Sequence, residues 1–428
     1  MSELAGQPLR QPFRLRITLA PVISLLLFIA VFAGFQGGRY FMANRLQELG
    51  ILCALLVFVL GAWLALFRLP QAEWKRWVYT PVFLVGGIMV VWSLVFALRF
   101  GENVIYCLFA SREFLLAFIG PAMYLICCSG YERWRLERVL WFAFLALMLN
   151  YLYFYFTLDL KQAFFSSDHT ISNLVTYDEW RGFRLKPPLF AIMLALLAGL
   201  VLLFGKGGLL QRLFAVILVA LACYIWSIVM FRSTLATMLL SVMLYPLFLA
   251  ARNRVAWMLL LVPLIAAAMP HLVGIAMDHF LNADGGGIRL KAFHIALDYI
   301  PRYFLLGAGE DNSYGRTYQD LFAFYFYPSD LGFIGITFKY GVIGAALYLY
   351  MHVTIWLRLL KGNWHYRSAN EGRMHPLLWA LLIFFTAQTF NLVLNPGLAY
   401  AQGITTGSIA IALCGILQRE SYRASDVG

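Results

Sequence analysis

Long runs of apolar residues, separated by short polar segments, make up most of this sequence. Twelve of these runs approach the roughly 20 residues that a helix needs to cross the hydrocarbon core of a membrane, at a rise of about 1.5 Å per residue. The pattern therefore predicts an all-α, polytopic integral membrane protein of about 12 transmembrane helices, with residues 1–428 forming one transmembrane domain. The predicted spans are residues 17–35, 49–67, 77–98, 113–129, 139–157, 188–204, 213–231, 234–251, 255–275, 332–356, 376–395 and 399–417.

Two segments between these spans are too long and too polar to be simple turns, residues 158–187 and residues 276–331. The second contains a glycine-rich stretch and then, from Arg289 to Tyr299, apolar residues at helical spacing. Pro301 limits this helix because proline disfavours helical geometry in the residue before it. We expect an amphipathic helix that lies at the membrane surface with its apolar face down against the membrane. The apolar residues are Leu290, Phe293, Ala296 and Leu297.

Composition agrees with a membrane protein and gives its orientation. The chain is 62% hydrophobic and 13% charged, whereas soluble chains carry about 25% charged residues. Each predicted inner segment is short and has at least two lysines or arginines, which places both termini in the cytoplasm by the positive-inside rule. The formal charge of +12 is thus partly a topology signal, and no nucleic-acid partner is expected.

The positive-inside rule does not account for fourteen basic residues on or near the predicted outer side, and ten of them are arginines. The outer side also carries most of the acids, so these arginines are expected to serve an anionic ligand. Arginine suits phosphate because its planar fork binds two oxygens at once and stays charged. The candidates singled out below are Arg181, Arg184, Arg232, Arg289, Arg316 and, within a span, Lys339.

The six cysteines show no metal-ligand or disulfide spacing, and five lie in apolar runs. Small apolar packing explains cysteines of this kind. The sequence therefore predicts neither a metal site nor a cofactor.

Three short motifs share the predicted outer side. An arginine, Arg289, precedes by eighteen residues the first glycine of a Gly307-Ala308-Gly309 turn. A second motif is the turn at residues 231–236, which contains Arg232. The third, at residues 329–334, contains Asp330 and begins the next predicted span.

In order, spacing and sidedness these motifs resemble the superfamily of O-antigen ligases and polymerases. The resemblance implies a metal-independent glycosyltransferase in the bacterial inner membrane, with the glycan donor carried on polyprenyl pyrophosphate. Ligases of the superfamily generally have a His-Asn pair where this chain has Ser329 and Asp330. That departure favours a Wzy-like polymerase, which joins lipid-linked repeat units in O-antigen or exopolysaccharide synthesis, with a chain-length regulator and a flippase as further partners.

The resemblance also suggests roles for individual residues. Arg289 and Arg232 would stabilise the pyrophosphate leaving group, since preorganised cations act best where charge develops. Asp330 would be the general base for the acceptor hydroxyl, with His294 as a second candidate. The expected substrate-binding residues are Arg181, Arg184, Arg316, Lys339, Gly307 and Gly309.

Structural readings of the same residues remain open at this stage. Asp330 could cap a helix, Arg232 could bind lipid headgroups, and Lys339 could be either paired or in a cavity. Two other functions are alternatives: an O-antigen ligase that transfers glycan to lipid A core, and a lipid-linked oligosaccharide flippase. A transporter is expected to carry repeats and ionisable groups near the membrane midplane.

Overall fold

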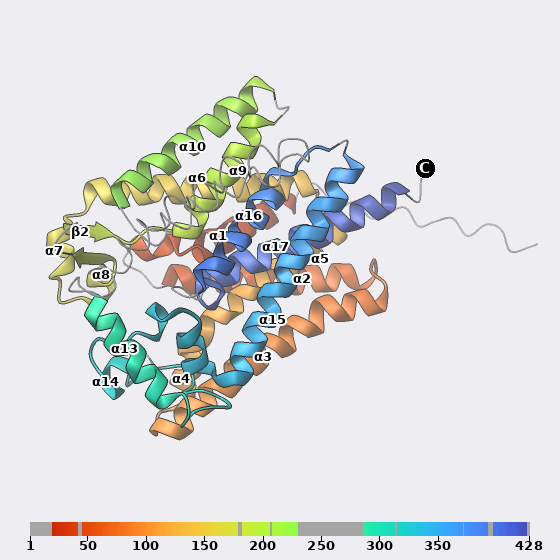
Figure 1. Ribbon diagram of the computed structural model, residues 1–428. Coiled ribbons are helices and arrows are strands. Elements are labelled where there is room, and N and C mark those ends of the chain that lie inside the picture. Colours follow the sequence, from red (N-terminus) through yellow and green to blue (C-terminus); the bar gives the residue numbers. More distant parts are fainter. Residues whose placement is uncertain are drawn as a thin grey trace, which may run out of the picture.

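The computed structural model describes residues 19–41, 45–178, 182–205, 208–229, 286–312, 315–370, 372–392 and 397–425 (Figure 1). Long helices dominate it. In chain order the elements are α1 (Ala20–Gly34), η1 (Gly37–Phe41), α2 (Arg45–Leu66), α3 (Gln71–Phe100), α4 (Val104–Ala110), η2 (Ser111–Phe118), α5 (Ile119–Cys128), α6 (Arg133–Thr157), α7 (Leu160–Phe164), α8 (His169–Ser172), β1 (Val175–Asp178), β2 (Gly182–Leu185), α9 (Leu189–Phe204), α10 (Leu209–Val229), α13 (Gly286–Tyr299), α14 (Tyr318–Leu321), η4 (Pro328–Asp330), α15 (Gly332–Ala369), α16 (Pro376–Asn391), η5 (Gly397–Ala399) and α17 (Ala401–Ser425).

Helix length and hydropathy identify a multi-pass membrane protein. Within the described residues, seven helices are long and apolar enough to cross a membrane, and α1, α9 and α16 are shorter apolar helices. Each of these falls on a span predicted from the sequence. The predicted spans 234–251 and 255–275 lie outside the described residues, so the expected count of twelve is not shown. The seven are Leu46–Leu66, Gln71–Phe100, Val104–Cys128, Arg133–Thr157, Leu209–Val229, Gly332–Ala369 and Ala401–Glu420.

The main hydrophobic core lies around α9 and α16, which are buried on nearly every side. A helix that is apolar all round belongs in such a position. The outer helices instead expose large apolar side chains, such as Trp63, Phe83 and Leu98 at 65%, 75% and 81%. Apolar exposure on this scale suits contact with lipid rather than with water.

The fourth span is longer than the sequence predicted and is interrupted. It begins at Val104 instead of residue 113, because Asn103 caps α4 by accepting a hydrogen bond from the amide of Ile105 at 2.9 Å. Its middle is the 3₁₀ helix η2, where Ser111 bonds Ser93 of α3 at 2.9 Å. The polar residues of η2 interrupt the hydrophobic pattern, so the sequence does not predict the first turns of this span.

The first long polar segment contains a β-hairpin that the sequence pattern did not predict. Strands β1 and β2 are antiparallel, with Val175 opposite Leu185 and Asp178 opposite Gly182. Val175 and Leu185 are buried against the main core. Four-residue strands are too short to give a clear alternation, so the all-α prediction holds apart from this hairpin.

One end of the molecule, which we call the loop end, carries the elements of both long polar segments. Figure 1 shows α7, α8, β2, α13 and α14 at this end, and the C-terminus lies away from it. Segments predicted to be cytoplasmic also come together, since Arg419 of α17 pairs with Glu73 of α3 at 2.9 Å and His375 lies 3.1 Å from Glu137 of α6. The predicted division of loops between two sides is therefore consistent with the fold.

Helix α15 is broken near the loop end. Gly341 has non-helical backbone angles, with φ of 66° and ψ of −172°. The segment 304–310 runs beside the break and bonds the backbone groups that the helix releases, as the membrane interior requires. These bonds are Ala308 N to Phe338 O at 2.8 Å, Gly309 N to Lys339 O at 2.8 Å, Val342 N to Phe304 O at 2.9 Å and Ile343 N to Leu305 O at 3.2 Å. From α3, Trp92 Nε1 donates to the carbonyl of Tyr340 at 3.1 Å.

Helix α13 confirms the helix predicted between Arg289 and Pro301, and the contact of its apolar face with the membrane stays a prediction. Ala292 and Ala296 are buried in a small core with α14 and α15, while Leu290 and Leu297 are 38% and 42% exposed. Small residues are buried because α13 packs closely on protein.

Candidate functional site

Asp330 lies at the loop end, in the short helix η4 that leads into α15. Leu331, not Asp330, occupies the N-cap of α15, and no side chain caps that helix. The capping reading of Asp330 is therefore wrong. Gly335 allows η4 to fold back closely, because a Cβ at this position would lie 1.8 Å from the carbonyl oxygen of Pro328.

Cations from separate segments act on Asp330. The charges of Arg289 in α13 and Lys186 after β2 both favour its ionised form, and the charge of Arg39 in η1 acts in turn on Lys186. Asp330 is exposed, yet the crowded protein around it displaces water. This desolvation outweighs the two cations and raises the pKa of Asp330 above its ordinary value.

Lys186 is held firmly by its backbone. Its amide donates to the carbonyl of Leu174 at 2.8 Å, and its own carbonyl accepts from the hydroxyl of Tyr40 at 2.5 Å. The pKa of Lys186 is lowered from 10.5 to about 8, mainly by burial and also by the charge of Arg39, while the charge of Asp330 opposes both. A lysine with this lowered pKa changes charge near physiological pH. The hydrogen bond from Tyr40 holds its backbone in place.

Tyr400, which precedes α17, links this site to a second polar cluster. Its hydroxyl is hydrogen-bonded to Ser329, the neighbour of Asp330, and the charges of both Asp330 and Glu310 reach it. Burial raises the pKa of Tyr400, so it stays protonated. Tyr400 is thus within the electrostatic reach of both carboxylates.

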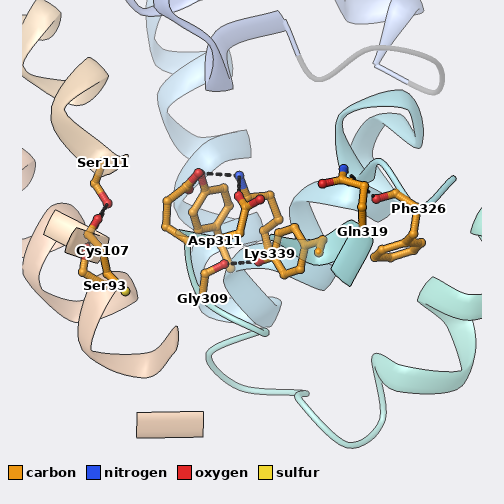
Figure 2. Close-up of polar contacts among 11 residues, drawn as sticks. Ser93, Cys107, Ser111, Gly309, Asp311, Gln319, Phe326 and Lys339 are labelled. Carbon is orange, nitrogen blue, oxygen red and sulfur yellow. Dashed lines mark hydrogen bonds and ion pairs between the residues drawn. The ribbon is translucent and has the colours of Figure 1, made fainter. Parts of the chain in front are cut away.

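The second cluster surrounds the break in α15. Lys339 Nζ lies 2.5 Å from Glu310 Oε1 and 3.9 Å from Asp311 Oδ1, and the Tyr340 hydroxyl donates to Glu310. Figure 2 shows Lys339 and Asp311 close together beside Gly309, whose carbonyl accepts from the Tyr318 hydroxyl. Lys339 is thus a paired lysine, and its predicted contact with substrate stays a prediction.

Burial raises the pKa of Asp311, and the Lys339 charge opposes this shift. Burial also raises the pKa of Tyr318 well above its ordinary value. The cluster therefore combines the ion pair of Lys339 and Glu310 with two buried groups, Asp311 and Tyr318, whose ionised forms are disfavoured by burial. This arrangement stabilises the break more readily than it binds a large anion.

Arg316 and Arg184, two predicted substrate-binding residues, have protein contacts. Arg316 Nε donates to Glu102 Oε1 at 2.8 Å, and this hydrogen bond lowers the pKa of Glu102. Arg184 is 8% exposed and its charge acts on Tyr151 of α6. Neither side chain is brought toward Asp330 by these contacts.

The remaining predicted residues differ in what the structure describes. His294 is exposed on α13, the helix that carries Arg289, and makes an edge-on contact with Phe293. Gly307 and Gly309 have φ of 69° and 102° and form the turn beside the α15 break. Arg181 and Arg232 lie outside the described residues.

Sequence reasoning missed four residues of this region: Arg39, Lys186, Glu310 and Tyr400. Arg39 and Lys186 belong to the fourteen basic residues on or near the predicted outer side, but no motif contains them. Residues 39, 186, 289 and 330 belong to four distant segments, so only the fold brings them together. One available signal was the position of Lys186 directly before Pro187 and Pro188, at a fixed junction between a loop and a helix.

Comparison with models of known protein families and with curated proteins found no match to this chain.

Proposed function

We propose that this chain is a membrane glycosyltransferase that polymerises lipid-linked oligosaccharide repeat units, with polyprenyl pyrophosphate as the leaving group. The observation that carries the proposal is that Arg289 and Lys186, from separate segments, lie close enough to Asp330 at the loop end for their charges to act on it, with Arg39 acting in turn on Lys186. A cationic site beside one carboxylate suits a reaction that removes a proton from an alcohol and releases a pyrophosphate.

The reaction would proceed with Asp330 as general base. Asp330 takes the proton of the acceptor hydroxyl while the hydroxyl oxygen forms a bond to the anomeric carbon of the donor. The bond from that carbon to the pyrophosphate oxygen breaks, and its electron pair leaves with the polyprenyl pyrophosphate. A raised pKa helps this role, because a stronger base accepts a proton more readily.

The cations would stabilise the charge that develops on the leaving group. Arg289 and Lys186 both lie near enough to influence Asp330, so a pyrophosphate bound between them would be close to the base. Arg232 is the further cation that the motif resemblance suggests. Fixed cations of this kind need little rearrangement as the bond breaks, which is the source of their catalytic effect.

The second candidate function is a transporter of lipid-linked oligosaccharides. The observation in its favour is the broken helix α15 with Lys339, Glu310 and Asp311 beside the break, since broken helices and buried ionisable groups are typical of transporters. The ion pair is closed, however, and segment 304–310 bonds the released backbone groups. These contacts favour a structural role for the break.

A direct test uses the purified protein in lipid nanodiscs with a polyprenyl-pyrophosphate-linked repeat unit. Formation of a ladder of longer lipid-linked glycans without another acceptor is the expected result. Transfer restricted to added lipid A core would instead indicate a ligase. Movement of the substrate across vesicle membranes with no new glycosidic bond would indicate the transporter.

The pH dependence of the reaction gives a separate prediction. We expect kcat/KM to fall above about pH 8, because Lys186 then loses the charge that it offers to the pyrophosphate. In Lys186→Arg this fall should disappear, since arginine stays charged throughout the range. Initial rates at subsaturating substrate between pH 6.5 and 9.5 provide the measurement.

Protein stability should change in the opposite direction over the same range. The pKa of Lys186 is lower in the folded than in the unfolded chain, so the unfolded chain binds more protons between about pH 8 and 10.5. This difference makes the contribution of Lys186 to stability rise with pH. If kcat/KM of Lys186→Arg fell above about pH 8 as it does in the wild type, the assigned role of Lys186 in binding the pyrophosphate would be contradicted.

A further inference from the structure

A groove of about 330 Å³ runs along one face of α3, α15 and α17. At the loop end it is lined by Trp92 and Tyr340, and at the opposite end by Arg76 and Arg358. Arg76 and Trp92 are sixteen residues apart on α3, so the groove extends about 24 Å along the helix axis. That length is most of a hydrocarbon core of about 30 Å.

The groove has a mainly apolar lining and opens to the side. Val85, Ile355 and Ile411 contribute to its walls, one from each helix. Tyr350, which also lines it, is 69% exposed. Since large exposed apolar groups on these helices face lipid, a lipid chain can enter between α3 and α15 without crossing the protein.

The two arginines at the far end distinguish this groove from an ordinary lipid-facing surface. Arg76 is exposed and Arg358 is partly buried, and their positive charges lie near enough to repel each other. In the described part of the chain no acid forms an ion pair with either. Three other arginines predicted to be on this side do pair with glutamates: Arg133 with Glu420, Arg135 with Glu132, and Arg419 with Glu73.

We infer that this groove binds an anionic phospholipid of the inner leaflet, with its phosphate between Arg76 and Arg358 and an acyl chain along α3 and α15. Charge complementarity supports this occupant, because an uncharged chain leaves two repelling guanidinium groups without a counter-ion. Arginine binds phosphate oxygens in pairs. The apolar lining receives the chain that follows the headgroup.

Lipid retention measured by native mass spectrometry tests this inference. The full-length protein is released from nanodiscs and titrated with phosphatidylglycerol, and in parallel with phosphatidylcholine. An arginine close to the lipid phosphate contributes about fivefold to the binding of anionic lipid. The double variant Arg76→Gln, Arg358→Gln should therefore bind phosphatidylglycerol about 25-fold more weakly, with phosphatidylcholine binding unchanged.

Matched variants separate this site from general attraction to the surface. Lys75→Gln removes the same charge from the neighbouring exposed position on α3, which does not line the groove, and should leave binding unchanged. Arg76→Lys with Arg358→Lys should retain most of the affinity. Thr354→Phe, which narrows the groove and keeps both charges, should weaken binding of long-chain but not of short-chain phosphatidylglycerol.

Three outcomes would overturn the inference. These are equal phosphatidylglycerol binding in wild type and the double glutamine variant, an equal loss in Lys75→Gln, and clear preference for polyprenyl phosphate over phosphatidylglycerol at the arginine pair. None of these measurements depends on glycan transfer, so they stand whatever the chain catalyses.

Discussion

Replacement of Asp330 by asparagine is expected to lower the rate of glycan transfer by about 100-fold or more. Asparagine keeps the size and the hydrogen-bonding shape of the side chain but cannot take a proton from the acceptor. The loss should appear in kcat, with KM little changed, because the cations that would hold the pyrophosphate remain. The rate of ladder formation by purified protein, at saturating repeat unit, provides the measurement.

The matched control is Asp298→Asn, which removes a carboxylate from the exposed surface of α13. It should retain most of the activity. The thermal unfolding midpoint of Asp330→Asn should stay at or slightly above that of the wild type, since the change removes a desolvated carboxylate. Asp330→Asn with more than half the wild-type kcat would exclude this residue as the base.

The largest effect on stability is expected for Gly309→Ala. Gly309 has φ of 102°, and a Cβ there would lie 2.5 Å from the amide nitrogen of Phe96 in α3. A backbone atom in the middle of a helix cannot move away as a side-chain tip does. We expect a loss of about 4 kcal/mol or more, in the range reserved for severe steric or backbone conflicts, measured by thermal or denaturant unfolding in detergent.

Gly101→Ala separates steric overlap from backbone strain alone. Gly101 ends α3 with φ of 71° and has nothing within 4 Å of a Cβ position. Its replacement by alanine should cost about 1–2 kcal/mol, the usual cost of a left-handed conformation. If the two variants were equally stable, the close approach of Gly309 to α3 would not be a feature of the folded protein.

Features set by local sequence were predictable. The apolar runs gave the positions of the spans that the structure describes, because the length of a membrane helix follows from the thickness of the bilayer. The helix after residue 285 and the turn at Gly307 and Gly309 also followed from local patterns. The early start of the fourth span at Val104 was missed, since the polar residues of η2 interrupt its hydrophobicity.

Features that depend on contacts between distant segments were not predictable. The sequence predicts Arg316 as a ligand-binding cation. The fold instead brings Oε1 of Glu102, more than 200 residues earlier, within 2.8 Å of Arg316 Nε. From the sequence, Lys186 is only one of the basic residues of the predicted outer side, although the fold places it near Asp330. Charge and motif identify which residue types are available, and the packing of helices decides which of them become partners.

The pairing of segment 304–310 with the broken helix α15 limits how this protein can be recombined with others. The carbonyls of Phe338 and Lys339 are bonded by the loop, and the indole of Trp92 in α3 bonds Tyr340. A chimera that exchanged residues 286–331 alone would place a new loop beside the backbone groups of α15 that the original loop bonds. The smallest transferable unit is therefore the loop together with the first turns of α15 and the matching face of α3, inherited as a single block.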